Sequence, residues 1–406
     1  MSPGPGQFEP ADVLNDQSSR QREPSMWDSS SVITYSNTNK VTLRQRLCLV
    51  TWGWFTISMS TGGLSILLYN QPHQFTGLKT IGKVFYIMNL VVFLFICSCL
   101  TLRFTANRSA LRESFQSPTE SYFIGTFMLA IATILMGAAD YGSPSCGPWL
   151  QVALRVLFWI YLAVSFIAAI GLNICHFHFR MGMKEKMAIV RVLPYFPTML
   201  GGTVASVLAQ HQPPKHAITM TIAGITMQGL GFLVSLFVYS EYIYNLSRDG
   251  LPDPAIRPEM FIAVGPLSFT AIAFIGAASV AQQLFPAHYI EAAKTVNTAD
   301  VAMVLAAFSS IFMWLLAFFF FSLAIMSLLA IYRSLHFSLV WWSCIFPNTG
   351  FIIATIRIGT VLHSPGILWV SSAMTIVLVA AWFIVGGLTV WSTFARRLLW
   401  PSDKEK

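Results

Sequence analysis

The sequence predicts an all-α, polytopic membrane protein, and three observations support this prediction. Of the 406 residues, 55% are hydrophobic and only 10% are charged, whereas a soluble domain carries about 25% charged residues. The apolar residues gather in long blocks, each close to the ~20 residues that a helix needs to cross the hydrocarbon of a bilayer. Ten such blocks can be distinguished, so we expect ten transmembrane helices.

The ten expected spans lie near residues 47–69, 84–104, 121–140, 149–174, 188–209, 217–243, 260–282, 300–332, 337–361 and 367–393. The segments between them carry proline with glycine or polar residues, as in Pro252-Asp253-Pro254, which is typical of loops. Residues 1–40 are polar and lack an early apolar segment, so we expect a disordered cytoplasmic tail there. A ten-helix domain over 41–396 and a short cytoplasmic tail over 397–406 complete the predicted organisation.

The distribution of charge predicts the orientation. The net charge is +8, but the cations lie between the apolar blocks and not on one face, which favours a lipid bilayer and not nucleic acid as the partner. With a cytoplasmic N-terminus, the inner segments hold most of the cations, among them Arg44, Arg46, Arg103, Arg108, Arg180, Lys184, Lys186, Arg191, Arg248 and Arg333. The outer segments hold Lys79, Lys83, Lys215 and Lys294. This positive-inside pattern predicts an even number of spans with both termini in the cytoplasm.

Prolines within the odd-numbered spans suggest how the helices are arranged. Pro197, Pro266 and Pro347 fall in the fifth, seventh and ninth spans, each close to glycine. A proline inside a span frees a carbonyl that lipid cannot satisfy, so such helices tend to lie inside a bundle or along a wet cavity. We therefore expect five helical hairpins, with odd-numbered helices inside and these prolines as hinges of pore helices. Simple packing kinks are the alternative.

Motifs for enzyme chemistry are absent from the sequence. It contains no glycine-rich phosphate loop, no HExxH and no GxSxG. The six cysteines include no CxxC pair. We therefore expect no enzyme, no cofactor and no metal site. Nor is there room for a nucleotide-binding domain, so any transport would be passive or coupled to an ion.

Cations within the spans are the candidate binding residues, because a charge inside the membrane usually faces a cavity or a partner. Arg155 lies about two turns into the fourth span, Arg357 in the outer half of the ninth and Arg103 at the inner end of the second. A guanidinium grips a carboxylate with two hydrogen bonds, so we predict that small organic anions bind here. A structural pair with Asp140 is the alternative for Arg155, and contact with the lipid headgroups is the alternative for Arg103.

Phe346 is the candidate pore gate. It precedes Pro347 midway along the ninth span, where a bulky ring would plug a narrow conduit as hydrophobic constrictions do. A phenylalanine that only fills the core is the alternative.

Four stretches together resemble the fungal malic acid transport proteins of the tellurite-resistance/dicarboxylate transporter family, which is related to the plant slow anion channels. They are Thr51-Trp52-Gly53-Trp54-Phe55 with Ser60-Thr61-Gly62-Gly63, Gly77-Leu78-Lys79-Thr80-Ile81-Gly82-Lys83, Arg257-Pro258-Glu259-Met260-Phe261 with Val264-Gly265-Pro266, and Ile345-Phe346-Pro347-Asn348-Thr349-Gly350-Phe351. The resemblance runs from about residue 41 to the end. It implies ten helices as five hairpins around a central pore, assembled as a homotrimer, most simply in the plasma membrane.

The same resemblance implies transport of C4-dicarboxylates such as malate and succinate, by proton-coupled import or passive export. It places Phe346 at the pore constriction, and it matches Arg103 and Arg155 to arginines of the malate transporters. Two positions depart from the pattern: Ser279 stands near a family arginine, and Arg357 stands where an acidic or neutral residue is expected. Export of another organic acid or sulfite, and a gated anion channel of the same fold, therefore stay open as alternatives. A membrane receptor or scaffold without transport is a third.

Overall fold

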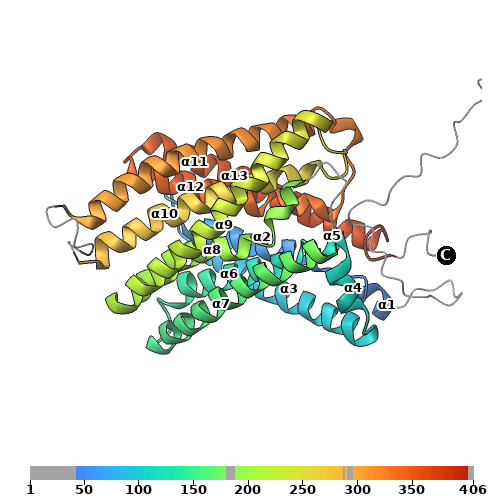
Figure 1. The fold of residues 1–406 in the computed structure, drawn as a ribbon, viewed down its shortest axis with the longest axis horizontal. Helices are drawn as coiled ribbons and strands as arrows, with labels where there is room; N and C mark the ends of the chain where they lie inside the picture. Colours follow the sequence, from blue (N-terminus) through green and yellow to red (C-terminus); the bar gives the residue numbers. More distant parts are fainter. Residues whose placement is uncertain (1–42, 180–187, 287–288, 290–295, 401–406) are drawn as a thin grey trace, which may run out of the picture.

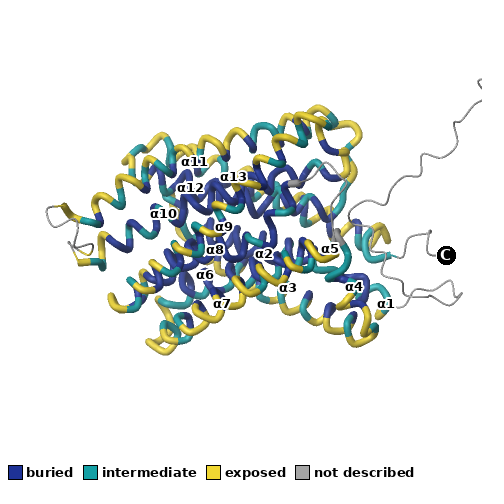
Figure 2. The backbone as a smooth tube through the Cα atoms, in the orientation of Figure 1, coloured by how far each residue is buried: buried dark blue, intermediate teal, exposed yellow. Residues whose placement is uncertain are grey.

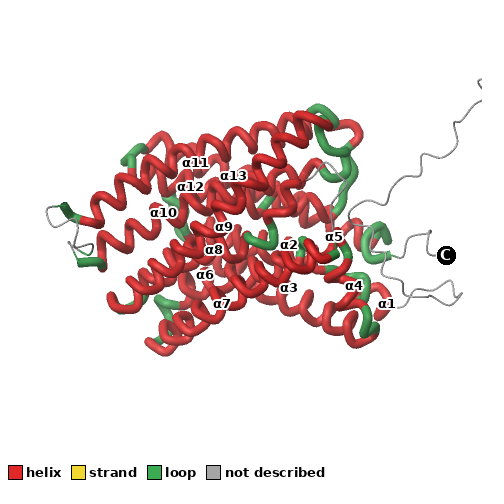
Figure 3. The backbone as a smooth tube through the Cα atoms, viewed as in Figure 1, coloured by secondary structure: helices red, strands yellow, loops and turns green. Residues whose placement is uncertain are grey.

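The computed structural model describes residues 43–179, 188–286, 289 and 296–400, and this part of the chain is helical without a β-strand (Figure 3). Ten main helices run roughly along one direction, and the short helices α1 (Leu43–Leu47), α4 (Ala110–Gln116) and α5 (Pro118–Ser121) gather at one end of the bundle (Figure 1). Eight helical segments of the described residues are long and apolar enough to cross a membrane. The predicted all-α, multi-pass fold is confirmed.

The main helices alternate between an inner and an outer position (Figure 2). The inner helices are α2 (Phe55–Tyr69), α6 (Ile124–Gly137), α8 (Phe196–Leu208), α10 (Val264–Leu284) and α12 (Phe346–Val361). The outer helices are α3 (Leu78–Ala106), α7 (Pro148–His178), α9 (Pro214–Asp249), α11 (Thr298–Leu329) and α13 (Pro365–Phe394). The inner elements correspond to the odd-numbered spans of the sequence prediction, so five consecutive inner–outer hairpins form as expected.

Burial explains why each set takes its position. All 13 residues of α8 are buried, whereas α13 buries Ser371, Thr375, Leu378 and Val385 along one face and exposes Ile376 and Phe383 on the other. Spacings of three, four and seven residues keep the buried side chains of a helix on one face. An exposed face this apolar is unfavourable in water but is satisfied by lipid tails. The outer helices therefore face the bilayer and screen the inner ring from it.

Short 3-10 helices precede four of the inner helices. They are η1 (Trp52–Trp54), η3 (Ala188–Val192), η5 (Arg257–Ala263) and η8 (Leu339–Cys344). The first and fifth expected spans are therefore divided, and their α-helical parts, α2 and α8, have only 15 and 13 residues. These two are shorter than the ~20 residues of a full span. The count of ten spans accordingly stays a prediction.

The mid-helix position expected for two of the prolines is wrong. Pro197 and Pro347 occupy the first turn of α8 and α12, where the missing N–H has no helical partner to lose. Pro266 lies in the first turn of α10, directly after η5. Each proline thus lies in the first turn of an α-helix that follows a 3-10 segment and not in the middle of an α-helix.

The remaining elements close the ends of the bundle. They are the π-helix η2 (Ala138–Gly142) and the 3-10 turns η4 (Ala209–His211) and η7 (Tyr332–Ser334). The predicted tail over 1–40 lies outside the described residues, as do residues 401–406 of the C-terminal tail. Arg180, Lys184, Lys186 and Lys294 lie outside them as well.

Candidate functional site

Three phenylalanine rings meet where the inner helices converge. Phe346 begins α12, and its ring stacks on Phe269 of α10 with centroids 4.9 Å apart. Phe196, at the start of α8, meets Phe346 edge-on at 6.1 Å and Phe269 at 5.7 Å. All three side chains are buried. Such offset and edge-on contacts stabilise aromatic clusters beyond their burial alone, so these rings form a rigid centre, here termed the phenylalanine cluster.

Each ring of the phenylalanine cluster lies against a glycine of the next inner helix. A Cβ added to Gly265 of α10 would lie 2.7 Å from the Phe196 ring, and one added to Gly350 of α12 would lie 2.7 Å from the Phe269 ring. A Cβ added to Gly63 of α2 would lie 3.1 Å from the Phe346 ring. These ring-to-glycine contacts therefore link α8 to α10, α10 to α12 and α12 to α2 around the bundle. Glycine is required because any side chain would displace a ring from its place.

A small cavity lies beside the phenylalanine cluster, between the first turns of the inner helices. Its volume is about 10 Å³, and Phe196 and Phe346 form part of its wall. Its other lining residues come from all five inner segments: Thr56, Met59, Phe123, Thr126, Leu193, Ile262, Ser343 and Pro347. A space of this size holds about one water molecule. The axis of the bundle is therefore too narrow at this level for a carboxylate or a hydrated anion.

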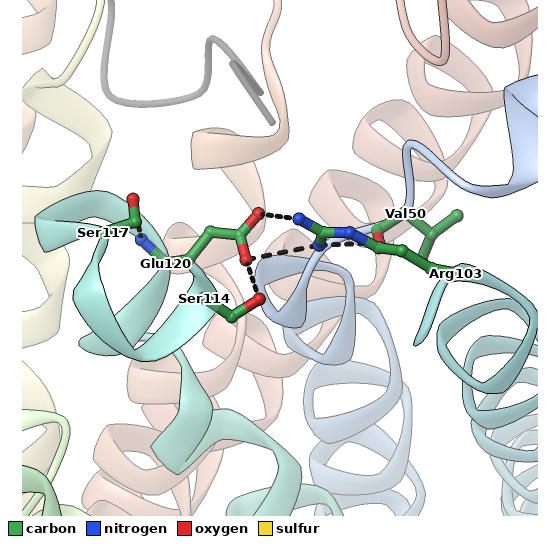
Figure 4. Close-up of polar contacts among 5 residues, drawn as sticks. All are labelled: Val50, Arg103, Ser114, Ser117 and Glu120. Atoms are coloured by element: carbon green, nitrogen blue, oxygen red, sulfur yellow. Dashed lines mark hydrogen bonds and ion pairs between the residues drawn. The ribbon is translucent and has the colours of Figure 1, made fainter. Parts of the chain in front are cut away.

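Arg103, a predicted anion ligand, is engaged by protein groups. Its guanidinium forms an ion pair with Glu120 at 2.9 Å and donates a hydrogen bond to the Val50 carbonyl at 3.2 Å (Figure 4). Ser114 donates a hydrogen bond to the same carboxylate at 2.6 Å. Arg103 is only 2% exposed and Glu120 12%. The contacts join the end of α3 to the segment before η1 and to the short helices α4 and α5. In this structure Arg103 therefore connects elements of the fold.

Breaking this ion pair should destabilise the protein, because it would leave a buried guanidinium without its counter-charge. We expect Glu120→Ala to lower the free energy of unfolding by about 3–5 kcal/mol, measured as a fall in melting temperature in detergent. The matched control is Asp249→Ala, which breaks the exposed ion pair with Arg248 and should change little. The double variant Arg103→Met/Glu120→Leu should recover most of the loss. Equal melting temperatures for Glu120→Ala and the parent protein would contradict a structural role.

Arg357 lies at the opposite end of the inner ring. Its guanidinium donates a hydrogen bond to the Asn70 side chain at 3.1 Å, at the end of α2. It also interacts electrostatically with Asp140 of η2, a buried carboxylate. The Nε of Arg357 and one carboxylate oxygen of Asp140 have no hydrogen-bond partner among the described residues. This pair of opposite charges therefore retains free hydrogen-bonding capacity.

The three predicted arginines do not form one site. Arg103 bonds to Val50 before α2, whereas Arg357 bonds to Asn70 after it, and the 15-residue helix between them is about 22 Å long. Arg155 is half-buried on the outer helix α7. Within the described part of the chain no ion pair joins it to Asp140, so the structural pairing considered for Arg155 is not formed.

Sequence reasoning missed several residues of this region. Phe196 had a usable signal, because Phe196-Pro197 repeats the Phe346-Pro347 dipeptide. No sequence signal marked Phe269, since its contact with Phe346 depends on how α10 packs against α12. Asp140 was considered only as a partner for Arg155, although an intramembrane carboxylate is itself a reason to expect function. Glu120, as the partner of Arg103, depends on the turn between α4 and α5 and could not be predicted.

Fold and site together define a multi-pass membrane protein with an aromatic constriction on the axis of an inner helix ring and arginines at both ends. Residues 49–390 match the SLAC1 family, described as the voltage-dependent anion channel family. The chain belongs to this family, which agrees with the expectation of a transport protein for small anions and not an enzyme.

Relatives with assigned names include both transporters and channels. The chain is 33% identical to the malic acid transport protein of Schizosaccharomyces pombe over 368 residues, which cover 90% of this chain and 83% of the relative. It is 26% identical to the sulfite efflux pump SSU1 of Trichophyton rubrum, over 85% of this chain and 91% of that protein. A shorter match of 134 residues, covering 32% of this chain and 18% of the relative, is 34% identical to the S-type anion channel SLAH3 of Arabidopsis thaliana.

Proposed function

We propose that this protein transports C4-dicarboxylates such as malate and succinate across the plasma membrane, by proton-coupled import or by passive export. The observation that carries the proposal is the 33% identity to a malic acid transport protein over 90% of the chain. The arginines within its helices are consistent with it, because a guanidinium binds carboxylates in a bidentate geometry.

The proposed route follows the axis of the inner ring. A dicarboxylate enters at the end that carries Arg357, where the partnerless Nε offers a donor. Arg155 on α7 raises the local concentration of anions there. The anion then passes between the inner helices and meets the phenylalanine cluster, where Phe346 acts as the gate. Movement of Phe346 is needed for passage, because the adjoining cavity holds only about one water.

The first turns of α8, α10 and α12, which hold Pro197, Pro266 and Pro347, are the proposed hinges of this movement. These first turns follow a 3-10 segment, directly in α10, after one residue in α12 and after the turn over residues 193–195 in α8, and changes of helix type often mark hinges. Arg103 would contact an anion only after release from Glu120, so we assign it to the ion pair first and to substrate second. Cytoplasmic termini and a homotrimer complete the proposal; the first rests on the positive-inside pattern and the second on the family resemblance.

Sulfite efflux is the second candidate, and a gated channel is a variant of the same mechanism. Ser279, which donates a hydrogen bond to Ile275 within α10, stands near an arginine expected of malate transporters. Because Arg357 stands where an acidic or neutral residue is expected, the positive charge has a different place in this chain, and a different placement of charge suits a different anion. The 26% identity to a sulfite efflux pump over 85% of the chain supports the same alternative.

Uptake of labelled malate into proteoliposomes, with and without a proton gradient, tests the proposal. We expect saturable uptake that succinate blocks and chloride does not. Faster malate uptake under an inward proton gradient would indicate proton-coupled import. Equal uptake with and without the gradient would indicate passive transport. Protein-free liposomes and heat-denatured protein serve as controls. Movement of sulfite or chloride without malate would overturn the dicarboxylate assignment.

A further inference from the structure

All five inner helices begin at the same level of the bundle. They run in one direction, because a single outer helix returns the chain between each inner helix and the next. The small cavity beside the phenylalanine cluster lies at this level. Its lining residues come from the beginnings of α2, α6, α8 and α12, or from the residues that lead into these helices, and from η5, which continues into α10. The N-terminal ends of five helices therefore surround one cavity.

The N-terminal end of a helix attracts anions. Each end carries roughly half of a positive elementary charge, which comes from backbone N–H groups without an acceptor in their own helix. In α12 the first helical hydrogen bond runs from the Thr349 N–H to the Ile345 carbonyl. The N–H groups of Phe346 and Asn348 come before this bond. The helix α8 begins in the same way, with Pro197 in its first turn. Such partial charges act strongly where protein and lipid exclude water.

One side chain of the cavity has a hydroxyl that is free to donate. Ser343 lines the cavity and is 3% exposed. Its Oγ forms no hydrogen bond within the described part of the chain and is not sealed off from the cavity. The other two hydroxyls of the lining already donate. Thr56 donates to the Gly53 carbonyl at 2.7 Å, and Thr126 donates to the Trp52 carbonyl at 3.1 Å. None of the described residues that line the cavity is ionisable, so the helix ends and Ser343 determine which charge it favours.

From these observations we propose that the N-terminal ends of the inner helices form an anion-binding site directly beside the gate, where the Ser343 hydroxyl donates a hydrogen bond to one carboxylate group of the transported acid. The helix ends supply a positive potential without a fixed cation, so an anion is attracted but not held tightly, which suits a site of passage. This site rests on the proposed transport of organic anions, and it adds a contact that none of the three arginines provides.

The site is complete only when the gate moves. In the closed state the cavity has a volume of about 10 Å³ and holds about one water molecule. Ser343 and Phe346 both line it, so displacement of the Phe346 ring adds the volume of that ring to the space in front of Ser343. A carboxylate that enters there loses water at the narrowest level of the bundle. The hydroxyl and the helix ends replace part of its hydration and so lower the barrier at the gate.

The first test measures anion flux with the gate removed. We would compare the efflux of labelled malate and of chloride from proteoliposomes that contain Phe346→Ala alone or Phe346→Ala/Ser343→Ala. We expect the second substitution to lower malate flux about tenfold, because it removes one hydrogen bond to a charged group. Phe346→Ala/Ser343→Thr keeps the hydroxyl and should restore the flux. Equal malate flux with and without the hydroxyl would overturn the role of Ser343, and a loss confined to chloride would overturn the carboxylate assignment.

The control is a buried serine away from the cavity. Ser235 of α9 is buried and donates a hydrogen bond to the Phe232 carbonyl at 2.7 Å. Phe346→Ala/Ser235→Ala should therefore retain the malate flux of Phe346→Ala. An equal loss of flux from this variant would mean that any buried serine has the same effect, and would overturn the assignment to Ser343.

A second test needs no transport, so it separates the site from the proposed function. Ser343→Asp and Ser343→Asn place a carboxylate or a neutral amide of equal size beside the helix ends. A site that favours anions stabilises the carboxylate, so the melting temperature of Ser343→Asp should match or exceed that of Ser343→Asn as the pH rises from about 4 to about 8. A fall of Ser343→Asp below Ser343→Asn over this range would show that the cavity rejects anions, as an apolar core does.

The two tests together distinguish the two possible failures. Rejection of the carboxylate in Ser343→Asp overturns the site even if malate is transported. A stable Ser343→Asp protein, together with chloride flux but no malate flux, supports an anion site at the helix ends and overturns the proposed transport of dicarboxylates.

Discussion

Phe346→Ala should open a leak for anions through the bundle. Phe346 packs on Phe269 at 4.9 Å and bounds a cavity of about 10 Å³, so removing its ring joins that cavity to the space the ring occupied. A wider, better hydrated passage lowers the barrier that a hydrophobic constriction imposes. We expect a rise in passive malate and chloride flux on the order of tenfold, which corresponds to ~1.4 kcal/mol of barrier. Flux into proteoliposomes is the measurement.

The control for this prediction is a phenylalanine of equal burial away from the axis. Phe320 of α11 is buried and stacks on Tyr239 of α9 at 5.1 Å. Phe320→Ala creates a comparable cavity between outer helices and should lose stability, by about 3–5 kcal/mol, without a leak. A similar leak from both variants would indicate general loosening. No leak from well-expressed Phe346→Ala would refute the gate.

Arg357→Gln should weaken transport of the physiological anion. The substitution removes a charged donor at the end of the inner ring, and hydrogen bonds to charged groups contribute about 1.5–3 kcal/mol, which corresponds to roughly a 10- to 150-fold loss of affinity. Arg357→Glu should be more severe, because it places a second carboxylate beside Asp140. The apparent KM for malate in proteoliposomes is the measurement, with expression and melting temperature recorded alongside.

Asp140 and Lys83 provide the controls for Arg357. Asp140→Asn removes the carboxylate that competes with an incoming anion for Arg357, so it should lower the KM, which is the opposite of the Arg357→Gln effect. Lys83→Gln removes an exposed cation at the start of α3, where solvent screens its charge, and should change the KM little. An unchanged KM in both Arg357 variants would exclude this arginine from substrate binding.

The architecture was predictable because membrane spans follow from local composition. Blocks of apolar residues predicted where the main helices lie, although the count of ten spans stays a prediction, and the prolines of the odd-numbered spans predicted which helices are inner. The same reasoning placed Pro197 and Pro347 in mid-helix, where they are not. Hydropathy averages over a window of residues, so it does not distinguish a continuous helix from a 3-10 segment that precedes a shorter one.

The candidate site was predictable only where one residue carries the signal. An arginine inside a span is conspicuous by itself, and so is a phenylalanine before a proline. The partners were not predictable, because Glu120, Asn70 and Phe269 meet Arg103, Arg357 and Phe346 only after distant helices pack. Whether an arginine is occupied by a carboxylate or available to a ligand is therefore decided by contacts that sequence spacing does not contain.

The sequence by itself determined that this protein is a multi-pass helical membrane protein, since burying apolar blocks in lipid and pairing every backbone group within helices depend on composition alone. Its motifs carried the resemblance to a family of anion transporters and channels, and the match of residues 49–390 to the SLAC1 family confirmed it. Tertiary structure alone decided the arrangement of the site. It placed each phenylalanine ring against a glycine of the next inner helix, separated Arg103 from Arg357 by the length of α2, and left the Nε of Arg357 without a hydrogen-bond partner among the described residues. These features follow from close packing between helices, where a single methyl group or one missing donor changes which contacts form.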